Sequence, residues 1–233
     1  MNPKDTPYSL SALRALALHT QGLTTPLGTD EPPAEEAIFE IVKRLGSIQI
    51  DTLQMVQRSH YLVLWSRLGK YFPAEFDRLA YNPAQRRIFE GWQHAACYIP
   101  LDEHRYQRPL MRRLRAQPGE HFRHWLAEPG NEAVFHAVLD RIRSEGALRA
   151  ADFEYNGPKR GSWWDWKPAK TALEHHFAIG DLMISERVNF QRVYDLTERV
   201  LPAWVDTCEP TTEERDRRWI DDAARSLGVC EPL

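Results

Sequence analysis

Cysteine is scarce in this sequence, and its distribution argues against a disulfide framework or a zinc cluster. The 233 residues include three widely separated cysteines, Cys97, Cys208 and Cys230. An odd number of distant cysteines favours reduced thiols. The histidine pairs His121/His124 and His175/His176 have no cysteine or carboxylate at ligand spacing, and adjacent histidines on a helix point in different directions. We therefore expect no metal and no cofactor.

Long hydrophobic runs are also missing. No stretch approaches the roughly 18 to 20 uninterrupted apolar residues of a membrane span, and the start, Met1-Asn2-Pro3-Lys4-Asp5, lacks the charged-then-apolar layout of a signal peptide. We therefore expect a cytoplasmic protein. A hydrophobic content of 42% with 11% aromatics supports a packed globular core in one large domain or two small ones.

The sequence has no overall excess of positive charge, which at first sight argues against a nucleic-acid partner. The net charge is −3, but residues 41 to 125 carry 14 basic and 7 acidic side chains, whereas the flanking segments are acidic. Five arginines lie within eleven residues of the sequence and form one basic run: Arg105, Arg108, Arg112, Arg113 and Arg115. Taken alone, this run is better explained as a solvated helical face.

Hydrophobic spacing predicts two helices near the N-terminus, Ser9 to Gln21 and Ala34 to Leu45, followed by a change of period. From Ser47 to Leu53 apolar and polar residues alternate, which is typical of a short extended segment. Gln49 and Asp51 then point to the same side, with their Cα atoms roughly 6 to 7 Å apart. From spacing alone they could equally be an exposed strand face, or Asp51 could cap the next helix beside Thr52.

Further helices are predicted at Arg58 to Gly69, Pro73 to Leu79, Gln85 to Cys97 and Leu101 to Arg115. The segment Gln117 to Asn131 has Pro and Gly at both ends and is the best candidate for a domain boundary.

The second half has the element order of a winged helix. The pattern predicts a helix from Asn131 to Gly146, a short helix from Arg149 to Glu154, a helix from Pro168 to Ile179, and strands at Leu182 to Arg187 and Phe190 to Leu196. In winged helices the third helix enters the major groove of DNA. We expect a mainly α fold with small β hairpins and tandem winged-helix domains at 1–117 and 130–205. This fold serves regulators and adaptors as well as enzymes, so it leaves function open.

Several segments together resemble the YcaQ/AlkZ family of bacterial DNA glycosylases, in order over about residues 8 to 205. They are Gly46-Ser47-Ile48-Gln49-Ile50-Asp51, Gln57-Arg58-Ser59-His60-Tyr61, Ser66-Arg67-Leu68-Gly69, Gly91-Trp92-Gln93-His94-Ala95-Ala96 and Trp163-Trp164-Asp165-Trp166-Lys167-Pro168-Ala169-Lys170-Thr171-Ala172-Leu173-Glu174. The resemblance implies winged-helix domains curved around double-stranded DNA, excision of alkylated purines by a monofunctional glycosylase, and unhooking of interstrand crosslinks.

The resemblance also implies a catalytic motif of Gln, an apolar residue, and Gln or Asp. Here the motif is Gln49-Ile50-Asp51, which looks like the YcaQ branch. An N7-alkylated guanine is already cationic, so negative charge near the sugar helps more than acid catalysis. We expect Asp51 to stabilise the sugar cation and activate a water, and Gln49 to orient that water or the sugar-phosphate.

The matched segments also supply candidate DNA contacts. Arg58 and Arg67 are expected to hold phosphates flanking the lesion, with surface ion pairs as the alternative. His60 and His94 are candidates for phosphate donors or for orienting the catalytic groups, and a half-buried structural histidine is the equal alternative for each.

Lys167, Lys170 and Thr171 stand at the start of the presumed recognition helix, where basic side chains and backbone N–H groups favour phosphate. The tryptophans before that helix fill the core more often than they stack on DNA: Trp163, Trp164 and Trp166.

Family members continue with a third winged-helix unit and a small β-rich part, and Thr211 to Leu227 is the expected opening helix of that unit, within a truncated segment 206–233. A chain lacking one arm of the clamp is expected to bind duplex DNA more weakly. The alternative to a glycosylase is a non-catalytic winged-helix DNA-binding protein or transcription regulator. A regulator normally dimerises on a palindrome, whereas the glycosylase is expected to be a monomer.

Overall fold

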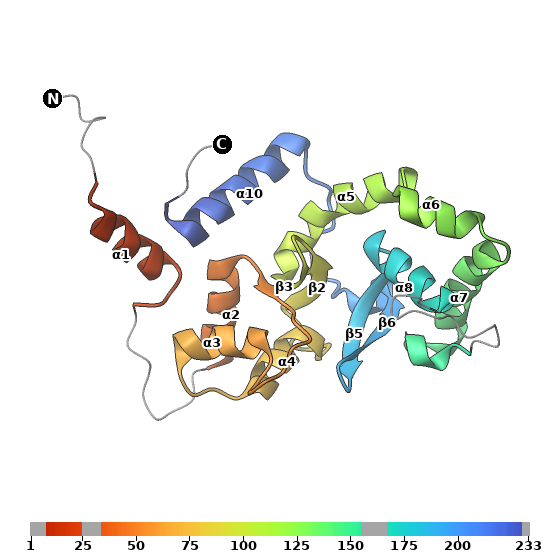
Figure 1. The fold of residues 1–233 in the computed structure, drawn as a ribbon, viewed down its shortest axis with the longest axis horizontal. Coiled ribbons are helices and arrows are strands. Elements are labelled where there is room, and N and C mark those ends of the chain that lie inside the picture. Colours follow the sequence, from red (N-terminus) through yellow and green to blue (C-terminus); the bar gives the residue numbers. More distant parts are fainter. Residues whose placement is uncertain (1–7, 25–33, 155–166, 230–233) are drawn as a thin grey trace. The chain divides into compact units, whose positions relative to one another are not determined.

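The computed structural model describes residues 8–24, 34–154 and 167–229, which form two compact units (Figure 1). Unit 1 comprises the described residues of 1–79, 93–100 and 210–233, and unit 2 comprises those of 80–92 and 101–209. Within these described ranges no helix combines the length and apolarity that crossing a bilayer requires.

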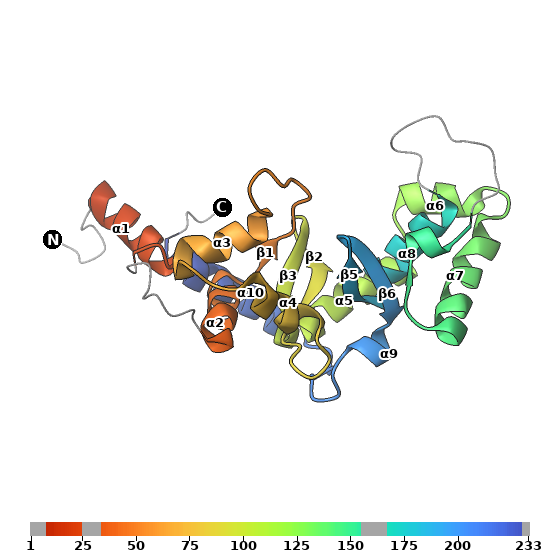
Figure 2. The ribbon, with the colours of Figure 1, turned by 90° about the horizontal axis from the view of Figure 1, so that it is seen from below.

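Unit 1 is built mostly of helices around one short strand pair, which Figure 2 shows from below. Its helices are α1 (Leu10–Thr20), α2 (Glu35–Leu45), α3 (Ser59–Leu68), most of α4 (Pro73–Tyr81) and α10 (Thr212–Leu227), and its strands are β1 (Ile48–Gln49) and β3 (Ala96–Pro100). Helix α2 packs against both α3 and β3.

The sequence of α2 explains both its helical form and its position. Ile38 and Val42 lie four residues apart on one face, and both side chains are fully buried. Two glutamates occupy the first turn, and Lys43 and Arg44 occupy the last, which suits the helix dipole. Gly46 ends the helix with a φ of 74°, a left-handed conformation that glycine adopts without steric cost, and so leads the chain into β1.

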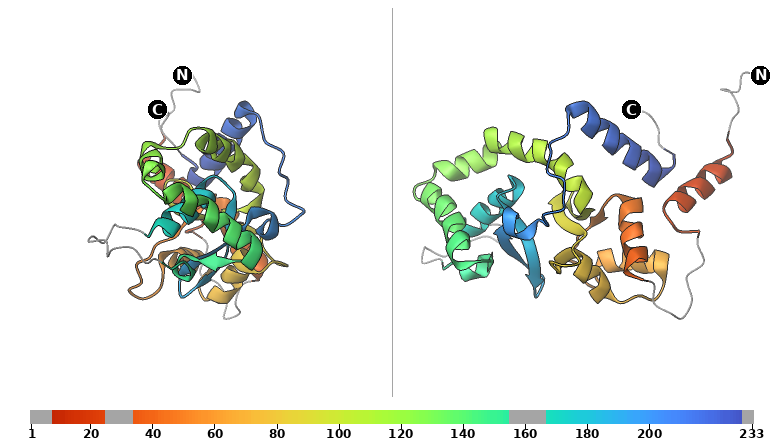
Figure 3. Two further views of the ribbon diagram at one scale, coloured as in Figure 1. Left: turned by 90° about the vertical axis from the view of Figure 1, so that its right-hand side faces the viewer. Right: turned by 180° about the vertical axis from the view of Figure 1, so that it is seen from behind.

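Unit 2 contains a second, three-stranded antiparallel sheet in the order β4-β6-β5. Its elements are β2 (Ile88–Trp92), the 3₁₀-helix η2 (Leu101–Glu103), α5 (His104–Ala116), α6 (Glu120–Ala127), α7 (Asn131–Glu145), β4 (Leu148–Arg149), the 3₁₀-helix η3 (Ala150–Asp152), α8 (Pro168–Ala178), β5 (Leu182–Val188), β6 (Gln191–Leu196) and α9 (Thr197–Val200). Tyr194 of β6 pairs with Leu148 on one side and with Ile184 on the other. Figure 3 gives two further views, with α7 in green and the β5–β6 hairpin in blue.

The core of unit 2 joins α7 and α8 to this sheet. Ile142 of α7, Leu173 of α8 and Ile184 of β5 are each at most 2% exposed and belong to one apolar cluster. Helix α8 packs against both α7 and β5. The hairpin turns through Asn189 and Phe190, whose φ angles are 50° and 66°. Two consecutive left-handed residues are typical of a tight hairpin turn whose twist matches the strands.

Most of the elements predicted from hydrophobic spacing are confirmed within a few residues, including the order helix, short helix, helix and hairpin of residues 131–196. The helix predicted from Gln85 to Cys97 is wrong, because β2 and β3 occupy this segment. Four consecutive residues are buried in each strand, 88–91 in β2 and 97–100 in β3, as is typical of strands covered on both faces. The segment Gln117 to Asn131, the predicted domain boundary, contains α6.

Candidate functional site

Gln49 faces solvent in unit 1 because β1 alternates between the core and the surface. The strand pairs antiparallel with β3, with Ile48 opposite Tyr98 and Gln49 opposite Cys97. Successive side chains of a strand point to opposite faces. Ile48 is accordingly buried at 2% exposure, and Gln49 is exposed. The side chain of Gln49 therefore points away from the core.

Asp51 is half-buried just after β1 and organises the turn that follows. Its Oδ1 accepts a hydrogen bond from the backbone N–H of Leu53 at 2.9 Å, an Asx turn in which the side chain stands in for a backbone carbonyl. Helix α3 begins only at Ser59, so the alternative in which Asp51 caps the next helix is wrong. Among the described residues Asp51 Oδ2 has no hydrogen-bond partner, which leaves it available to a ligand.

His94 reaches the same place from a distant part of the sequence. It lies in the turn before β3, which the Gln93 N–H closes by donating to the Ala95 carbonyl at 2.9 Å. Its Nε2 donates to Gln49 Oε1 at 3.4 Å. Within the described part of the chain, the Gln49 amide nitrogen has no partner. The long hydrogen bond therefore orients the amide and leaves its N–H groups free to donate.

Arg58 and His60 have different positions, although both follow the motif. The Arg58 guanidinium donates to the Thr52 carbonyl at 3.0 Å and thereby ties the start of α3 to the segment after Asp51. His60 is completely buried, and its ring packs 4.2 Å from the ring of Tyr61 and 5.3 Å from that of Tyr98. A phosphate contact by His60 finds no support in this position, and the alternative of a structural histidine describes it better.

Arg67 connects α3 to the end of α1. Its Nε donates to the Gln21 carbonyl at 2.8 Å, and its Nη1 donates to the Val63 carbonyl and to Ser66 Oγ at 2.9 and 3.0 Å. Partial burial lowers its pKa from the ordinary value. The guanidinium is thus engaged with backbone carbonyls of unit 1, so neither a phosphate contact nor a surface ion pair describes its place in the structure.

Lys167, Lys170 and Thr171 belong to unit 2, where they lie around the first turn of α8. Lys167 is exposed and precedes Pro168, the first residue of the helix. Its carbonyl accepts hydrogen bonds from the N–H groups of Lys170 at 2.9 Å and Thr171 at 3.3 Å. The predicted place of these residues at a helix N-terminus is confirmed. Trp163, Trp164 and Trp166 lie outside the described residues.

The sequence reasoning missed a buried network in unit 2. Glu90 of β2 has no exposed side-chain surface and accepts hydrogen bonds from Arg187 Nε and Nη2 at 2.6 and 2.7 Å. It also accepts from Arg192 Nε at 3.2 Å and from the hydroxyl of Tyr81 at 2.8 Å. Arg192 in turn donates to Glu174 Oε2 of α8 at 2.8 Å. The network fastens the β5–β6 hairpin to β2 and α8.

Burial alone would raise the pKa of Glu90, but the hydrogen bonds from Arg187 and the charges of Arg187 and Arg192 outweigh it, so the pKa lies below its ordinary value. The only signal in the sequence is an acidic residue within the otherwise apolar run Ile88 to Gly91. Its two arginine partners are about 100 positions away and carry no pattern that links them to Glu90.

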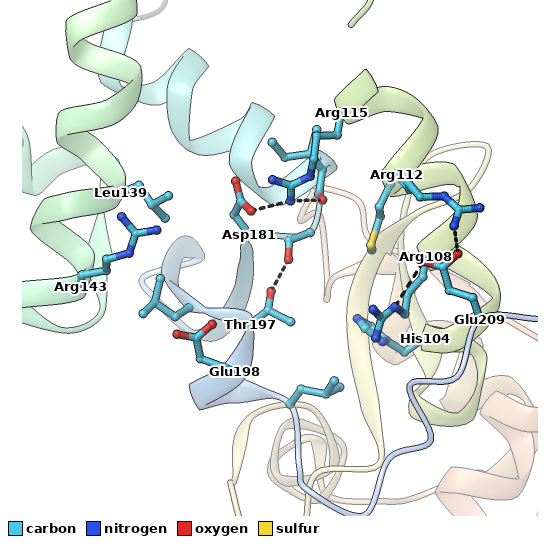
Figure 4. A pocket seen from close by; sticks show the side chains of 15 residues that line it. His104, Arg108, Arg112, Arg115, Leu139, Arg143, Asp181, Thr197, Glu198 and Glu209 are labelled. Carbon is cyan, nitrogen blue, oxygen red and sulfur yellow. Dashed lines mark hydrogen bonds and ion pairs between the residues drawn. The ribbon is translucent and has the colours of Figure 1, made fainter. Parts of the chain in front are cut away.

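The arginine run of α5 borders a cavity of about 440 Å³ within unit 2 (Figure 4). Four arginines of the run meet carboxylates. Arg105 pairs with Asp206 at 2.5 Å, Arg115 with Asp181 at 2.5 Å, and Arg108 and Arg112 both with Glu209, at 3.9 and 2.7 Å. The run is therefore partly neutralised inside its own unit.

His104 also lines this cavity and is only 3% exposed. Within the described residues neither of its ring nitrogens has a hydrogen-bond partner, and burial lowers its pKa to about 4. The ring is therefore neutral at pH 7. In the pair His175/His176, the His176 ring is held by the protein itself, since it bonds to Asp181 and to the Phe135 carbonyl, each at 2.8 Å.

Comparisons with known proteins bear on the family and the fold of the chain. Residues 42–232 match the protein family described as DNA glycosylase AlkZ-like. Among solved structures, the chain is similar to the DNA glycosylase AlkZ of Streptomyces sahachiroi, with a TM-score of 0.60 and 14% identity. The likeness covers 96% of this chain and 58% of that one, so the chain spans less than two thirds of the length of this relative. At this level of identity the likeness establishes a shared fold.

Proposed function

Because the chain belongs to the AlkZ-like family of DNA glycosylases, we propose that it hydrolyses the N-glycosidic bond of N7-alkylated purines in double-stranded DNA and thereby also unhooks interstrand crosslinks. The proposal depends on two neighbouring groups at the end of β1. The Gln49 amide is oriented by His94, and the Asp51 carboxylate has one oxygen available to a ligand. Such a pair suits chemistry at a sugar carbon.

The proposed reaction begins with a purine that already carries a positive charge. The C1′–N9 bond breaks with both electrons going to the base, so the base leaves neutral and the sugar becomes an oxocarbenium ion. The Asp51 carboxylate stabilises that cation and accepts a proton from the water that attacks C1′. The products are the free alkylated base and an abasic site.

Gln49 acts as the positioning partner in this proposal. Since His94 Nε2 donates to its carbonyl oxygen, the amide N–H groups are directed to other acceptors. They orient the attacking water or a phosphate oxygen next to the lesion. His94 would then act through Gln49, and not on the DNA directly.

The finer features expected from the sequence belong to the same proposal. The order α7, η3, α8 and β5–β6 supports a winged helix in unit 2, with Lys167, Lys170 and Thr171 near DNA phosphates at the start of α8. The domain boundaries 1–117, 130–205 and 206–233 stay predictions, as do a monofunctional mechanism, a monomeric state and a cytoplasmic location near the nucleoid.

The proposal is tested with Asp51→Asn. The asparagine carbonyl can still accept from the Leu53 N–H, so the turn keeps its hydrogen bond while the charge is lost. Removing a general base typically costs about 10² to 10⁴ in rate. We expect that loss in single-turnover release of N7-methylguanine from duplex DNA, measured as alkali-labile strand breaks.

The matched control is Asp221→Asn, which removes an exposed carboxylate from α10 in the same unit. It should release the base at the rate of the unchanged protein. Equal release by Asp51→Asn would remove Asp51 from the mechanism. DNA binding without release by the unchanged protein would instead support the non-catalytic DNA-binding alternative.

A further inference from the structure

Next to the candidate site, unit 1 exposes three large apolar side chains within four residues. Leu53, Met55 and Val56 are 72%, 95% and 89% exposed. We name residues 52–58 the apolar loop. In Figure 2 the chain between β1 and α3 stands clear of both elements. By contrast, Ile38 and Val42 of the same unit are fully buried. Unit 1 therefore has an apolar core, and the three side chains of the loop lie outside it.

The apolar loop is closed by its own hydrogen bonds. The Leu53 N–H donates to Asp51 Oδ1 at 2.9 Å, and Arg58 Nη1 donates to the Thr52 carbonyl at 3.0 Å. An isolated antiparallel bridge pairs Gln54 with Arg58. A loop closed at its base in this way holds its tip away from the rest of the unit, so Met55 and Val56 are held in solvent.

The loop is joined to the candidate catalyst. Asp51 supplies one of the hydrogen bonds that close it, and Leu53 is two residues away, at most about 7 Å along the chain. Met55 is four residues away, at most about 14 Å. Any DNA that brings its sugar to Asp51 therefore comes within reach of these apolar side chains. Stacked bases offer flat apolar faces that match them, whereas phosphates do not.

We propose that the apolar loop is a wedge, in which Met55 and Val56 insert between base pairs beside the lesion and open the stack so that Asp51 and Gln49 reach the sugar. This inference rests on the proposed glycosylase function. Apolar side chains that enter between base steps are a known means of unstacking and kinking a duplex. Here the wedge and the catalytic carboxylate share one hydrogen-bonded turn, so insertion and approach to the sugar are a single movement.

The test measures unstacking separately from chemistry. The probe is a duplex that carries 2-aminopurine beside a 2′-fluoro N7-methylguanine nucleotide, whose glycosidic bond resists cleavage because the fluorine disfavours the sugar cation. Fluorescence of 2-aminopurine rises when its neighbour is unstacked. Four proteins are compared: the unchanged chain, Met55→Ser/Val56→Ser, Met55→Leu/Val56→Ile, and Ile220→Ser. The last removes a 68%-exposed apolar side chain from α10.

We expect the unchanged protein, Met55→Leu/Val56→Ile and Ile220→Ser to raise the fluorescence of 2-aminopurine alike. Met55→Ser/Val56→Ser, the serine variant, should leave it near the value of free DNA. On a normal N7-methylguanine duplex the serine variant should release the base about tenfold more slowly or worse. The deficit should shrink when the lesion sits in an unpaired bulge. Both replaced side chains are exposed, so thermal unfolding of the serine variant should match that of the unchanged chain.

The wedge and the proposed activity can fail separately. A fluorescence rise that depends on Met55 and Val56, with no base release by the unchanged protein, would refute the activity and support the wedge. Base release without a fluorescence rise, or equal rises for the serine variant and the unchanged chain, would overturn the wedge and keep the activity. A concentration-dependent dimer that the serine variant abolishes would assign the loop to a contact between copies and also overturn the wedge.

Discussion

Replacing Glu90 by glutamine tests the buried network of unit 2. The side chain keeps its size and one acceptor, but it loses the charge that pairs with Arg187 and Arg192. It also places an NH₂ group where one carboxylate oxygen now accepts from Arg187, at 2.6 Å for Oε1 or 2.7 Å for Oε2. Both arginines are at most 13% exposed, so water cannot replace the lost acceptor easily.

The size of the effect follows from which arginine loses its carboxylate partner. Breaking a buried ion pair by removing one partner costs about 3 to 5 kcal/mol. Arg192 keeps Glu174 at 2.8 Å, whereas Arg187 loses its carboxylate charge and one of its two hydrogen bonds to residue 90. We therefore expect the lower end, about 3 kcal/mol. At about 2 to 4 °C per kcal/mol for a protein of this length, Tm falls by about 6 to 12 °C.

The assay is thermal unfolding followed by circular dichroism at neutral pH, with Glu186→Gln as the control. Glu186 is an exposed carboxylate on the same hairpin, and its replacement should stay within about 0.5 kcal/mol. The pKa of Glu90 is lowered in the folded state. Its stabilisation is therefore present above the unfolded value of about 4.3 and is lost as the pH falls through the lower folded value. The Tm difference between the variant and the unchanged chain should shrink below about pH 4. Equal Tm values at neutral pH would refute the reasoning.

Two further changes probe unit 2. Gly180→Ala should lower the free energy of unfolding, measured by chemical denaturation, by about 1 to 2 kcal/mol. Its φ is 81°, and the new Cβ would lie 2.7 Å from Met111 Sδ. The control is Gly119→Ala, whose new Cβ meets nothing within 4 Å and which should be neutral in the same measurement. His104 has a pKa lowered to about 4, so the folded state is favoured above the unfolded value of about 6.5 and loses about 2 to 3 kcal/mol as the pH falls from there towards 4. His104→Leu should flatten the decline in denaturation midpoint over that range, and an unaltered slope would contradict the role of His104.

The helices were predictable where one apolar stripe decides the structure. In α2 the spacing of Ile38 and Val42 and the terminal Gly46 gave the element and its end. The failure at Gln85 to Cys97 has a physical cause, because strands buried on both faces have no alternation that separates them from a buried helix. Tertiary pairing with β1 decides that β3 is extended.

In the candidate site, too, some features could be predicted from the local sequence and others depend on tertiary packing. The direction of Gln49 followed from local alternation, whereas its hydrogen bond to His94 depends on the β1–β3 pairing across 45 residues of sequence. The local sequence pattern also could not predict that His60 is buried and His94 is exposed, because both lie in segments that resemble the family. Side-chain contacts between distant segments are decided by packing, which periodicity does not encode.

Charge counting along the sequence overstates the positive potential around α5. Four arginines of its run face Asp181, Asp206 and Glu209 within unit 2. Several of these pairs are exposed at the arginine, and exposed ion pairs contribute little stability. A DNA phosphate can therefore replace a carboxylate at small cost, but each exchange also leaves that carboxylate near the phosphate. If the proposed function holds, the attraction of this region for DNA follows the net charge of the arginines and their partners. We therefore expect the start of α8, where Lys167 is exposed beside a helix N-terminus, to be the better phosphate site in unit 2.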